Sequence, residues 1–192
     1  MPRAGLSTET VVAEAARLVD EPGTGRLTLA GLAKRFGVAL PSLYKHVDGL
    51  EDLHGRLAVR VAVEVGDAMR RAATGKASAD ALRAVAAAYR DYAHHHPGGY
   101  GYLLRAPAAD NAAHVAAATE ILDVLDDVFA GYGITGDDAV DAARLVRSAL
   151  HGFVSLEVVG GFGMPHSVDR SFDRVVDALD HALDTWSAPA SR

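Results

Sequence analysis

Apolar residues recur at helical spacing along almost the whole chain, and this periodicity constrains the fold more than any other sequence feature. The clearest stripe reads Phe172, Val175, Val176, Leu179, Ala182, Leu183 and Trp186, with charged residues on the opposite side. Apolar residues three and four positions apart lie on one face of an α-helix. No convincing stretch alternates apolar and polar residues as a strand does. The sequence therefore predicts an all-α fold.

Glycine, proline and capping residues divide the periodic stretches into about nine helices. The expected helices follow Ser7, follow Thr28, begin at Pro41, begin near Asp48, and then span about 79–95, 100–104, 109–132, 137–159 and 169–186. The first three would form a helix-turn-helix head over residues 1–50. The remainder, residues 51–192, would form a helical domain for ligand binding and dimerisation, which the long fourth helix joins to the head.

Composition excludes several classes of protein. The chain contains no cysteine, which excludes disulfides and thiolate chemistry. Met1–Gly5 lead into the polar stretch Ser7–Thr10, unlike a secretory signal, and no run of apolar residues is long enough to span a membrane. We therefore expect a cytoplasmic protein. The net charge is −6, but the first 60 residues hold eight basic and seven acidic side chains, so the acidity lies in the C-terminal part.

The segment Leu27–Val47 carries the strongest functional signal. It predicts a short helix, a tight turn at Gly37, and a second short helix that begins at Pro41 and crosses the first. Leu43 and Val47 would anchor the second helix to the core. The side chains left facing outward would be Ser42, Tyr44, Lys45 and His46. Hydroxyl, aromatic and cationic groups on such a helix suit the major groove of DNA.

This segment resembles the helix-turn-helix of the tetracycline-repressor (TetR) family. The matching motifs are Leu27-Thr28, Leu32-Ala33, Phe36-Gly37-Val38 and Pro41-Ser42-Leu43-Tyr44-Lys45-His46-Val47. The resemblance covers the first 60 residues. The number of helices expected in residues 51–192, called the body below, also matches the family. It implies a homodimeric repressor that binds near-palindromic double-stranded operator DNA and is released by a small-molecule effector.

The resemblance also implies roles for individual residues. Thr28 and His46 match phosphate contacts, and the recognition-helix contacts are Pro41, Ser42, Tyr44 and Lys45. Ala30 and Leu40 depart from the tetracycline-responsive members, which have arginine and glutamine there. Leu40 can offer only an apolar contact, for example to a thymine methyl group, so we expect a different operator.

Two further groups of residues are candidates in the body. An aromatic and apolar cluster around the Pro97-Gly98-Gly99 bend is either ordinary core or the effector pocket, whose residues would be Tyr89, Tyr92, Tyr100, Leu104, Leu122 and His151. The last two helices would form the dimer interface, because small residues allow close approach and the apolar stripe supplies area. The expected interface residues are Gly152, Leu156, Phe172, Val176, Leu179 and Leu183.

We expect no catalytic, metal or cofactor site. His94-His95-His96 point in different directions on a helix, which makes them poor joint metal ligands, and no Gly-x-Ser-x-Gly motif is present. The alternative function is a helical small-molecule-binding protein or enzyme that carries an incidental helix-turn-helix. Binding to DNA from the chain's own upstream region distinguishes the two.

Overall fold

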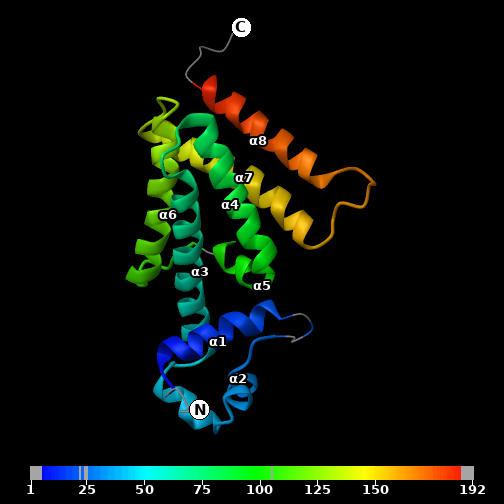
Figure 1. Cartoon of the computed structure of the whole chain (residues 1–192). Helices are drawn as coiled ribbons and strands as arrows, with labels where there is room; N and C mark the ends of the chain where they lie inside the picture. Colours follow the sequence, from blue (N-terminus) through cyan, green and yellow to red (C-terminus); the bar gives the residue numbers. More distant parts are fainter. Residues whose placement is uncertain (1–5, 22, 24–25, 105, 187–192) are drawn as a thin grey trace. The chain divides into compact units, whose positions relative to one another are not determined.

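The protein is helical throughout the part that the structure, a computed structural model, describes: residues 6–21, 23, 26–104 and 106–186. Met1–Gly5, on which the expectation of no secretory signal rests, lie outside these residues. The elements are α1 (Thr8–Asp20), α2 (Leu29–Phe36), the 3₁₀ helix η1 (Leu40–Lys45), α3 (Leu50–Ala73), α4 (Ser78–His95), α5 (Pro97–Tyr100), the 3₁₀ helix η2 (Gly101–Leu104), α6 (Ala112–Ala130), α7 (Asp137–Val158) and α8 (Val168–Asp184) (Figure 1). Since η2 continues α5 without a break, the described residues hold nine helical segments and no strand. The all-α prediction is confirmed.

The chain divides into two compact units. The first runs to Ala62 and also takes in His96–Ala117, and the second holds Val63–His95 with the described residues from Ala118 onward. The first unit therefore extends past the expected boundary at residue 50. Its core includes Leu53 and Leu57 of α3, which are fully buried beside the apolar residues of α1, α2 and η1.

Local sequence explains how the helices of the first unit begin and end. Ser7 caps α1, because its hydroxyl accepts a hydrogen bond from the backbone N–H of Thr10. Thr28 caps α2 in the same way. Gly37 ends α2 in the left-handed conformation, with φ of 66°, which a residue with a side chain rarely adopts. The predicted tight turn therefore lies at Gly37.

Helices α1 and α5 approach very closely within the first unit. A Cβ atom added at Gly98 would lie 1.8 Å from the carbonyl oxygen of Val19, so only glycine fits there. The backbone N–H groups of Gly98 and Gly99 donate to Asp20 Oδ1 at 3.0 and 2.8 Å. The carboxylate of Asp20 thus supplies acceptors for amides at the start of α5, which have no partner inside that helix.

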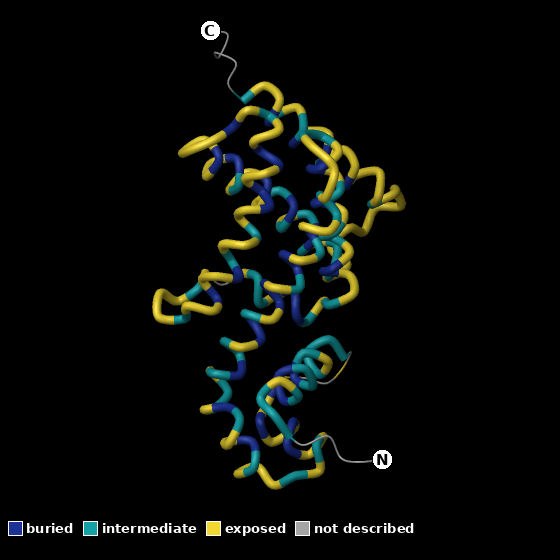
Figure 2. Tube along the Cα trace, turned by 60° about the vertical axis from the view of Figure 1, so that its left-hand side comes forward, coloured by how far each residue is buried: buried dark blue, intermediate teal, exposed yellow. Residues whose placement is uncertain are grey.

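Helices α4, α7 and α8 pack against one another in the second unit (Figure 1). Buried residues recur with helical period along α4, α7 and α8, as the sequence pattern predicts. Figure 2 shows the same mixture of buried and exposed positions along the helices of the chain. None of the helices within the described ranges is long and apolar enough to cross a lipid bilayer.

Candidate functional site

The predicted recognition segment, η1, is held firmly to the core of the first unit. Leu43 and Val47 are buried, as the sequence predicts, and lie in the same apolar cluster as α1 and α2. The hydroxyl of Thr8 in α1 donates a hydrogen bond of 3.0 Å to the backbone carbonyl of His46. Apolar anchors and a cross-link to α1 therefore fix the orientation of the segment.

The segment is a 3₁₀ helix, whereas the sequence predicts a short helix there without specifying its type. The N–H of Ser42 bonds to the carbonyl of Ala39, and the N–H of His46 bonds to that of Leu43. In a 3₁₀ helix, side chains three positions apart lie almost directly above one another. The six residues therefore form three pairs: Leu40 with Leu43, Pro41 with Tyr44, and Ser42 with Lys45.

These pairs differ in exposure. Pro41 and Tyr44 are exposed, Tyr44 to 54%, and form an apolar and aromatic edge. Lys45 is also exposed, whereas Ser42 above it is half-buried. Neither Tyr44 nor Lys45 makes a side-chain hydrogen bond or ion pair with any described residue. Their polar groups are accordingly available to an outside partner.

His46, expected to face outward, is only half-buried, so part of its ring remains accessible. Leu40 is 37% exposed although its pair, Leu43, is fully buried. The seven predicted DNA contacts thus divide into exposed and half-buried side chains, and none belongs to the buried core.

Thr28 lies at the start of α2 with its side chain exposed. Its Oγ1 accepts a hydrogen bond of 3.1 Å from the N–H of Gly31. A hydroxyl group can donate while it accepts, so the proton of Thr28 remains free for an acceptor such as phosphate. One hydroxyl can therefore cap the helix and bind an anion at its N-terminus.

Arg35, a basic residue on α2, forms ion pairs with acidic residues of its own unit. Its guanidinium forms ion pairs with Glu14 and Glu21, including a hydrogen bond of 2.7 Å from Nη1 to Glu21 Oε2. The hydrogen bonds to Glu21 and then Glu14 raise the pKa of Arg35 above its ordinary value. The charge of Arg35 is therefore largely balanced within the first unit, although a count of basic residues in the sequence includes it.

The six residues predicted for the effector pocket do not come together in either unit. Tyr100 and Leu104 belong to the first unit, and Tyr89, Tyr92, Leu122 and His151 belong to the second. Leu104 is 56% exposed and Leu122 is 49% exposed, so neither side chain is enclosed. Tyr92 is buried, and its hydroxyl donates to Glu64 Oε2 at 2.9 Å.

Tyr89 and His151, two of the predicted pocket residues, contact each other. The Tyr89 hydroxyl lies 3.2 Å from Nδ1 of His151, and Ser155 Oγ lies 3.1 Å from Nε2. Burial, followed by the charge of Arg147, lowers the pKa of His151 below its ordinary value. The imidazole is therefore neutral near pH 7, and one nitrogen donates while the other accepts.

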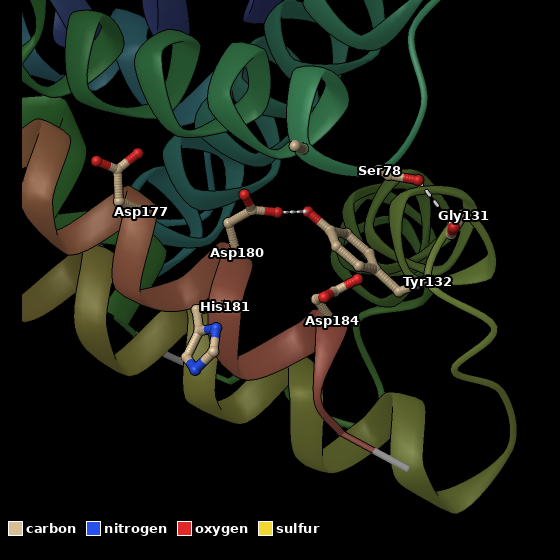
Figure 3. Close-up of a pocket in the computed structure, with 8 residues that line it drawn as sticks. Ser78, Gly131, Tyr132, Asp177, Asp180, His181 and Asp184 are labelled. Atoms are coloured by element: carbon tan, nitrogen blue, oxygen red, sulfur yellow. Dashed lines mark hydrogen bonds between the residues drawn. The ribbon is translucent and has the colours of Figure 1, made fainter. Parts of the chain in front are cut away.

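A cavity of about 490 Å³ lies elsewhere in the second unit. Its lining residues are Ser78, Ala79, Gly131, Tyr132, Asp177, Asp180, His181 and Asp184 (Figure 3). The Tyr132 hydroxyl donates to Asp180 at 2.7 Å, and burial together with this carboxylate raises the pKa of Tyr132. The cavity lining includes none of the residues predicted for the effector. Within the described part of the chain, no three potential metal ligands are grouped as a binding site.

The predicted dimer residues fall into two groups. Gly152 and Leu156 of α7 are exposed, Leu156 to 51%, and a Cβ atom at Gly152 would meet nothing within 4 Å. The four residues predicted on α8 are buried within the chain itself: Phe172, Val176, Leu179 and Leu183. They have almost no area left to bury against a partner. The α8 part of the prediction is therefore corrected: these side chains belong to the protomer's own core.

An anchored, exposed short helix that follows a helix and a glycine turn defines the helix-turn-helix class of DNA-binding proteins. The family model of the tetracyclin repressor-like C-terminal domain matches residues 82–179. The chain belongs to this tetracycline-repressor (TetR) family and is a helix-turn-helix transcriptional regulator.

Two bacterial relatives are similar over most of their length. The chain is 41% identical over 158 residues to the uncharacterized HTH-type transcriptional regulator Rv0681 of Mycobacterium tuberculosis, covering 82% of this chain and 72% of that protein. It is 33% identical over 186 residues to the uncharacterized HTH-type transcriptional regulator YobS of Bacillus subtilis, covering 96% and 93%.

A solved structure of a TetR variant from Acinetobacter baumannii AYE, in complex with minocycline, has the same fold. Its TM-score is 0.72, with 21% identity over 96% of this chain and 100% of that one. At this identity the likeness supports the fold alone.

Proposed function

We propose that the protein is a dimeric repressor that binds near-palindromic operator DNA and leaves it when a small-molecule effector binds. The observation that carries the proposal is the exposed surface of η1, where the polar groups of Tyr44 and Lys45 have no partner among the described residues. A regulator of this kind acts in the cytoplasm, where operator DNA lies. Its charged surface outside the head is acidic, and only the head carries a slight positive balance.

Each exposed group of the head has a DNA contact that suits its chemistry. Thr28 and His46 would contact phosphate, and Lys45 would contact phosphate or guanine. The remaining contacts in the groove would come from Leu40, Pro41, Ser42 and Tyr44. Phosphate contacts position the protein, and contacts to base edges select the sequence.

Footprinting on DNA from the chain's own upstream region, followed by titration of the protected duplex, tests this proposal. Tyr44→Ala or Lys45→Ala should each weaken binding by about 1–3 kcal/mol per half-site, because each removes an exposed contact from a segment that other residues anchor. Helicity should stay unchanged. Lys76→Ala, which removes an exposed lysine from the second unit, is the matched control. Unchanged affinity in both η1 variants would contradict this placement of the recognition surface.

We place the dimer interface on the exposed face of α7 and on the outer face of α8. The exposed or half-buried residues at helical spacing are Leu145, Ala149, Gly152 and Leu156 on α7, and Val159 directly after it. On α8, three apolar residues that are exposed or half-buried flank the buried ones: Val175, Ala178 and Ala182. Small residues let helices approach closely, and the leucines supply apolar area for a four-helix interface between two protomers.

We propose that the effector binds in the body, with Tyr89 and His151 as polar contacts. Their hydrogen bond offers a donor and an acceptor beside apolar helix faces, which suits a small organic molecule. The affinities for effector and operator must then be linked reciprocally, so a 100-fold loss of DNA affinity corresponds to about 2.7 kcal/mol of coupling. Compounds that release the protein from its operator identify the effector. Tyr89→Phe should weaken that release and leave DNA affinity unchanged.

A further inference from the structure

Helix α1 is held at both of its ends by hydrogen bonds to segments that are distant in the sequence. At its first residue, the Thr8 hydroxyl donates to the backbone carbonyl of His46, directly after η1. At its last residue, the Asp20 carboxylate accepts from the backbone N–H groups of Gly98 and Gly99 in α5. Because the first of these bonds and the apolar cluster of the first unit hold η1 to α1, whatever fixes α1 also fixes the recognition segment.

The contact between α1 and α5 includes two glycines, whose hydrogen bonds to Asp20 define how the two helices are placed. Gly98 and Gly99 present no side chain to α1, and a Cβ atom at Gly98 would lie 1.8 Å from the carbonyl oxygen of Val19. The second carboxylate oxygen of Asp20 lies 2.9 Å from Nδ1 of His96. Only 19% of the Asp20 side chain is exposed, so solvent screens these interactions weakly.

Capping α5 does not by itself require a residue of α1. The N-cap position of α5 is His96, whose side chain makes no capping hydrogen bond. A serine, threonine, asparagine or aspartate at that position would satisfy the same amides locally. The acceptor comes instead from Asp20, 78 positions before Gly98. The long-range hydrogen bonds therefore do what a local cap would not, because they join the head to the segment that follows α4.

This junction is an attachment of the head in addition to α3. Helix α3 runs without a break from the first unit into the second, and its Leu53 and Leu57 lie in the apolar cluster of the first unit. Helix α4, which Glu157 of α7 holds at its last turns, ends at His95, and α5 begins two residues later at Pro97. A head attached through α3 alone could pivot about that helix, whereas attachment at α5 as well opposes the motion.

A dimer binds two half-sites only where their separation and their rotation about the DNA axis match those of its two recognition segments. The more firmly each head is held, the more strictly the dimer selects that spacing. We propose that Asp20 is a positioning residue that sets the half-site spacing the protein accepts, because it fixes α1 to α5. This proposal rests on the proposed function of a dimer on operator DNA. It goes beyond that function, because it assigns spacing selectivity to a residue outside the predicted DNA contacts.

Operators of altered spacing test the proposal. The footprinted operator is compared with a duplex that carries two additional base pairs between its half-sites and with a duplex that holds one half-site. Two base pairs rotate one half-site by about 70° about the DNA axis, because B-DNA has about 10.5 base pairs per turn. The wild-type protein should bind the lengthened operator at least about 100-fold more weakly than the native one, since the gain from two linked contacts is lost.

Asp20→Ala removes both oxygen atoms that hold α5, and it should reduce this discrimination to about tenfold or less. Its affinity for the single half-site should stay within about twofold of the wild type, because the head keeps its internal contacts. Asp20→Asn keeps one oxygen acceptor for the glycine amides and should have an intermediate effect. It replaces Asp20→Ala if circular dichroism shows that the alanine variant does not fold. Ser7→Ala, which removes the cap at the other end of α1, is the matched control and should keep the full discrimination.

The outcomes separate this proposal from the proposed function. A wild-type protein that protects no DNA, or that binds the operator no better than the half-site, contradicts the proposed dimeric operator binding. If the wild type selects its spacing and Asp20→Ala selects it as strictly, the proposal for Asp20 alone is overturned. If Asp20→Ala loses as much affinity for the half-site as for the operator, Asp20 only stabilises the head, and the proposal is overturned as well.

Discussion

At the scale of single residues, Thr28 combines two roles in one hydroxyl group. Its oxygen caps α2 by accepting from Gly31, and its proton is free to donate to phosphate. Thr28→Val removes both, so it should lower the free energy of unfolding by about 1 kcal/mol and also weaken DNA binding. Thr28→Asp separates the roles, because aspartate is an equally good cap but cannot donate and repels phosphate.

Urea unfolding and fluorescence anisotropy with operator DNA measure these two effects. Thr28→Asp should match the wild type in stability and lose DNA affinity, whereas Thr28→Ser should keep both properties. If Thr28→Asp binds the operator as well as the wild type does, the hydroxyl does not contact phosphate.

Sequence reasoning at this scale worked where a residue's role depends on its own helix. The buried anchors Leu43 and Val47 follow from spacing alone, and so do the caps at Ser7 and Thr28. The role of Asp20 could not be predicted, because its partners Gly98 and Gly99 are 78 and 79 positions away. The one available hint was the Pro-Gly-Gly bend, which shows that the backbone turns there but not what it meets.

At the scale of elements, the recognition segment shows why helix type is hard to read from sequence. Residues Leu40–Lys45 span only six positions, over which the apolar spacings of α- and 3₁₀ helices are almost the same. The exposed and buried sides were therefore largely predicted, while the pairing of side chains three apart was not. That pairing, which places Pro41 with Tyr44, needed the structure.

The contact between α1 and α5 gives a second prediction. Gly98→Ala would place a methyl group against the Val19 carbonyl, so α5 must move away and its amides must leave Asp20. Because backbone atoms cannot yield as a flexible side chain can, we expect a loss of at least about 3 kcal/mol in urea unfolding. Gly101→Ala is the control, because its φ is −58° and a Cβ there meets nothing within 4 Å. Similar stability of the two variants would contradict this account of the contact.

Helices α4 and α7 are joined by ion pairs at Glu157. This carboxylate accepts from Arg90 Nε at 2.8 Å and lies 3.0 Å from His94 Nε2. The hydrogen bond from Arg90, supported by His94 and opposed by burial, lowers the pKa of Glu157 below its ordinary value of 4.5. The carboxylate therefore adds stability above the unfolded-state pKa, and this contribution is lost as pH falls through the folded-state pKa.

Glu157→Gln should consequently lower the free energy of unfolding at pH 7 by about 1–3 kcal/mol. It should also make the loss of stability below about pH 5 shallower than in the wild type. Urea unfolding at a series of pH values measures both effects. Glu120→Gln, at an exposed ion pair with Arg70, should change stability by less than about 1 kcal/mol. If the free energy of unfolding falls as steeply with decreasing pH in Glu157→Gln as in the wild type, this carboxylate does not contribute as described.

At the scale of the whole molecule, a stripe of apolar residues does not reveal which surface covers it. The α8 stripe predicted for the dimer is covered by the chain's own helices α4 and α7. The stripe on α7 that includes Gly152 and Leu156 is exposed. Both patterns look alike in the sequence, because a helix presents an apolar face equally to its own protomer and to a second one. Helix count and fold class were predictable, whereas the assignment of faces was not.

The proposed dimer makes Gly152 the most informative position on α7. Its Cβ would meet nothing within 4 Å in the protomer, so we expect Gly152→Trp to keep the fold of the single chain. Across a close helix interface, the same indole would overpack the partner and separate the protomers. Sedimentation at micromolar concentration should therefore show a dimer for the wild type and a monomer for Gly152→Trp, with equal helicity by circular dichroism. The variant should also bind a palindromic operator more weakly, because its two heads are no longer joined.

Gly101→Trp, at an open position of the first unit, is the control and should remain dimeric. A wild-type monomer, or a Gly152→Trp dimer as tight as the wild type, would exclude α7 as the interface.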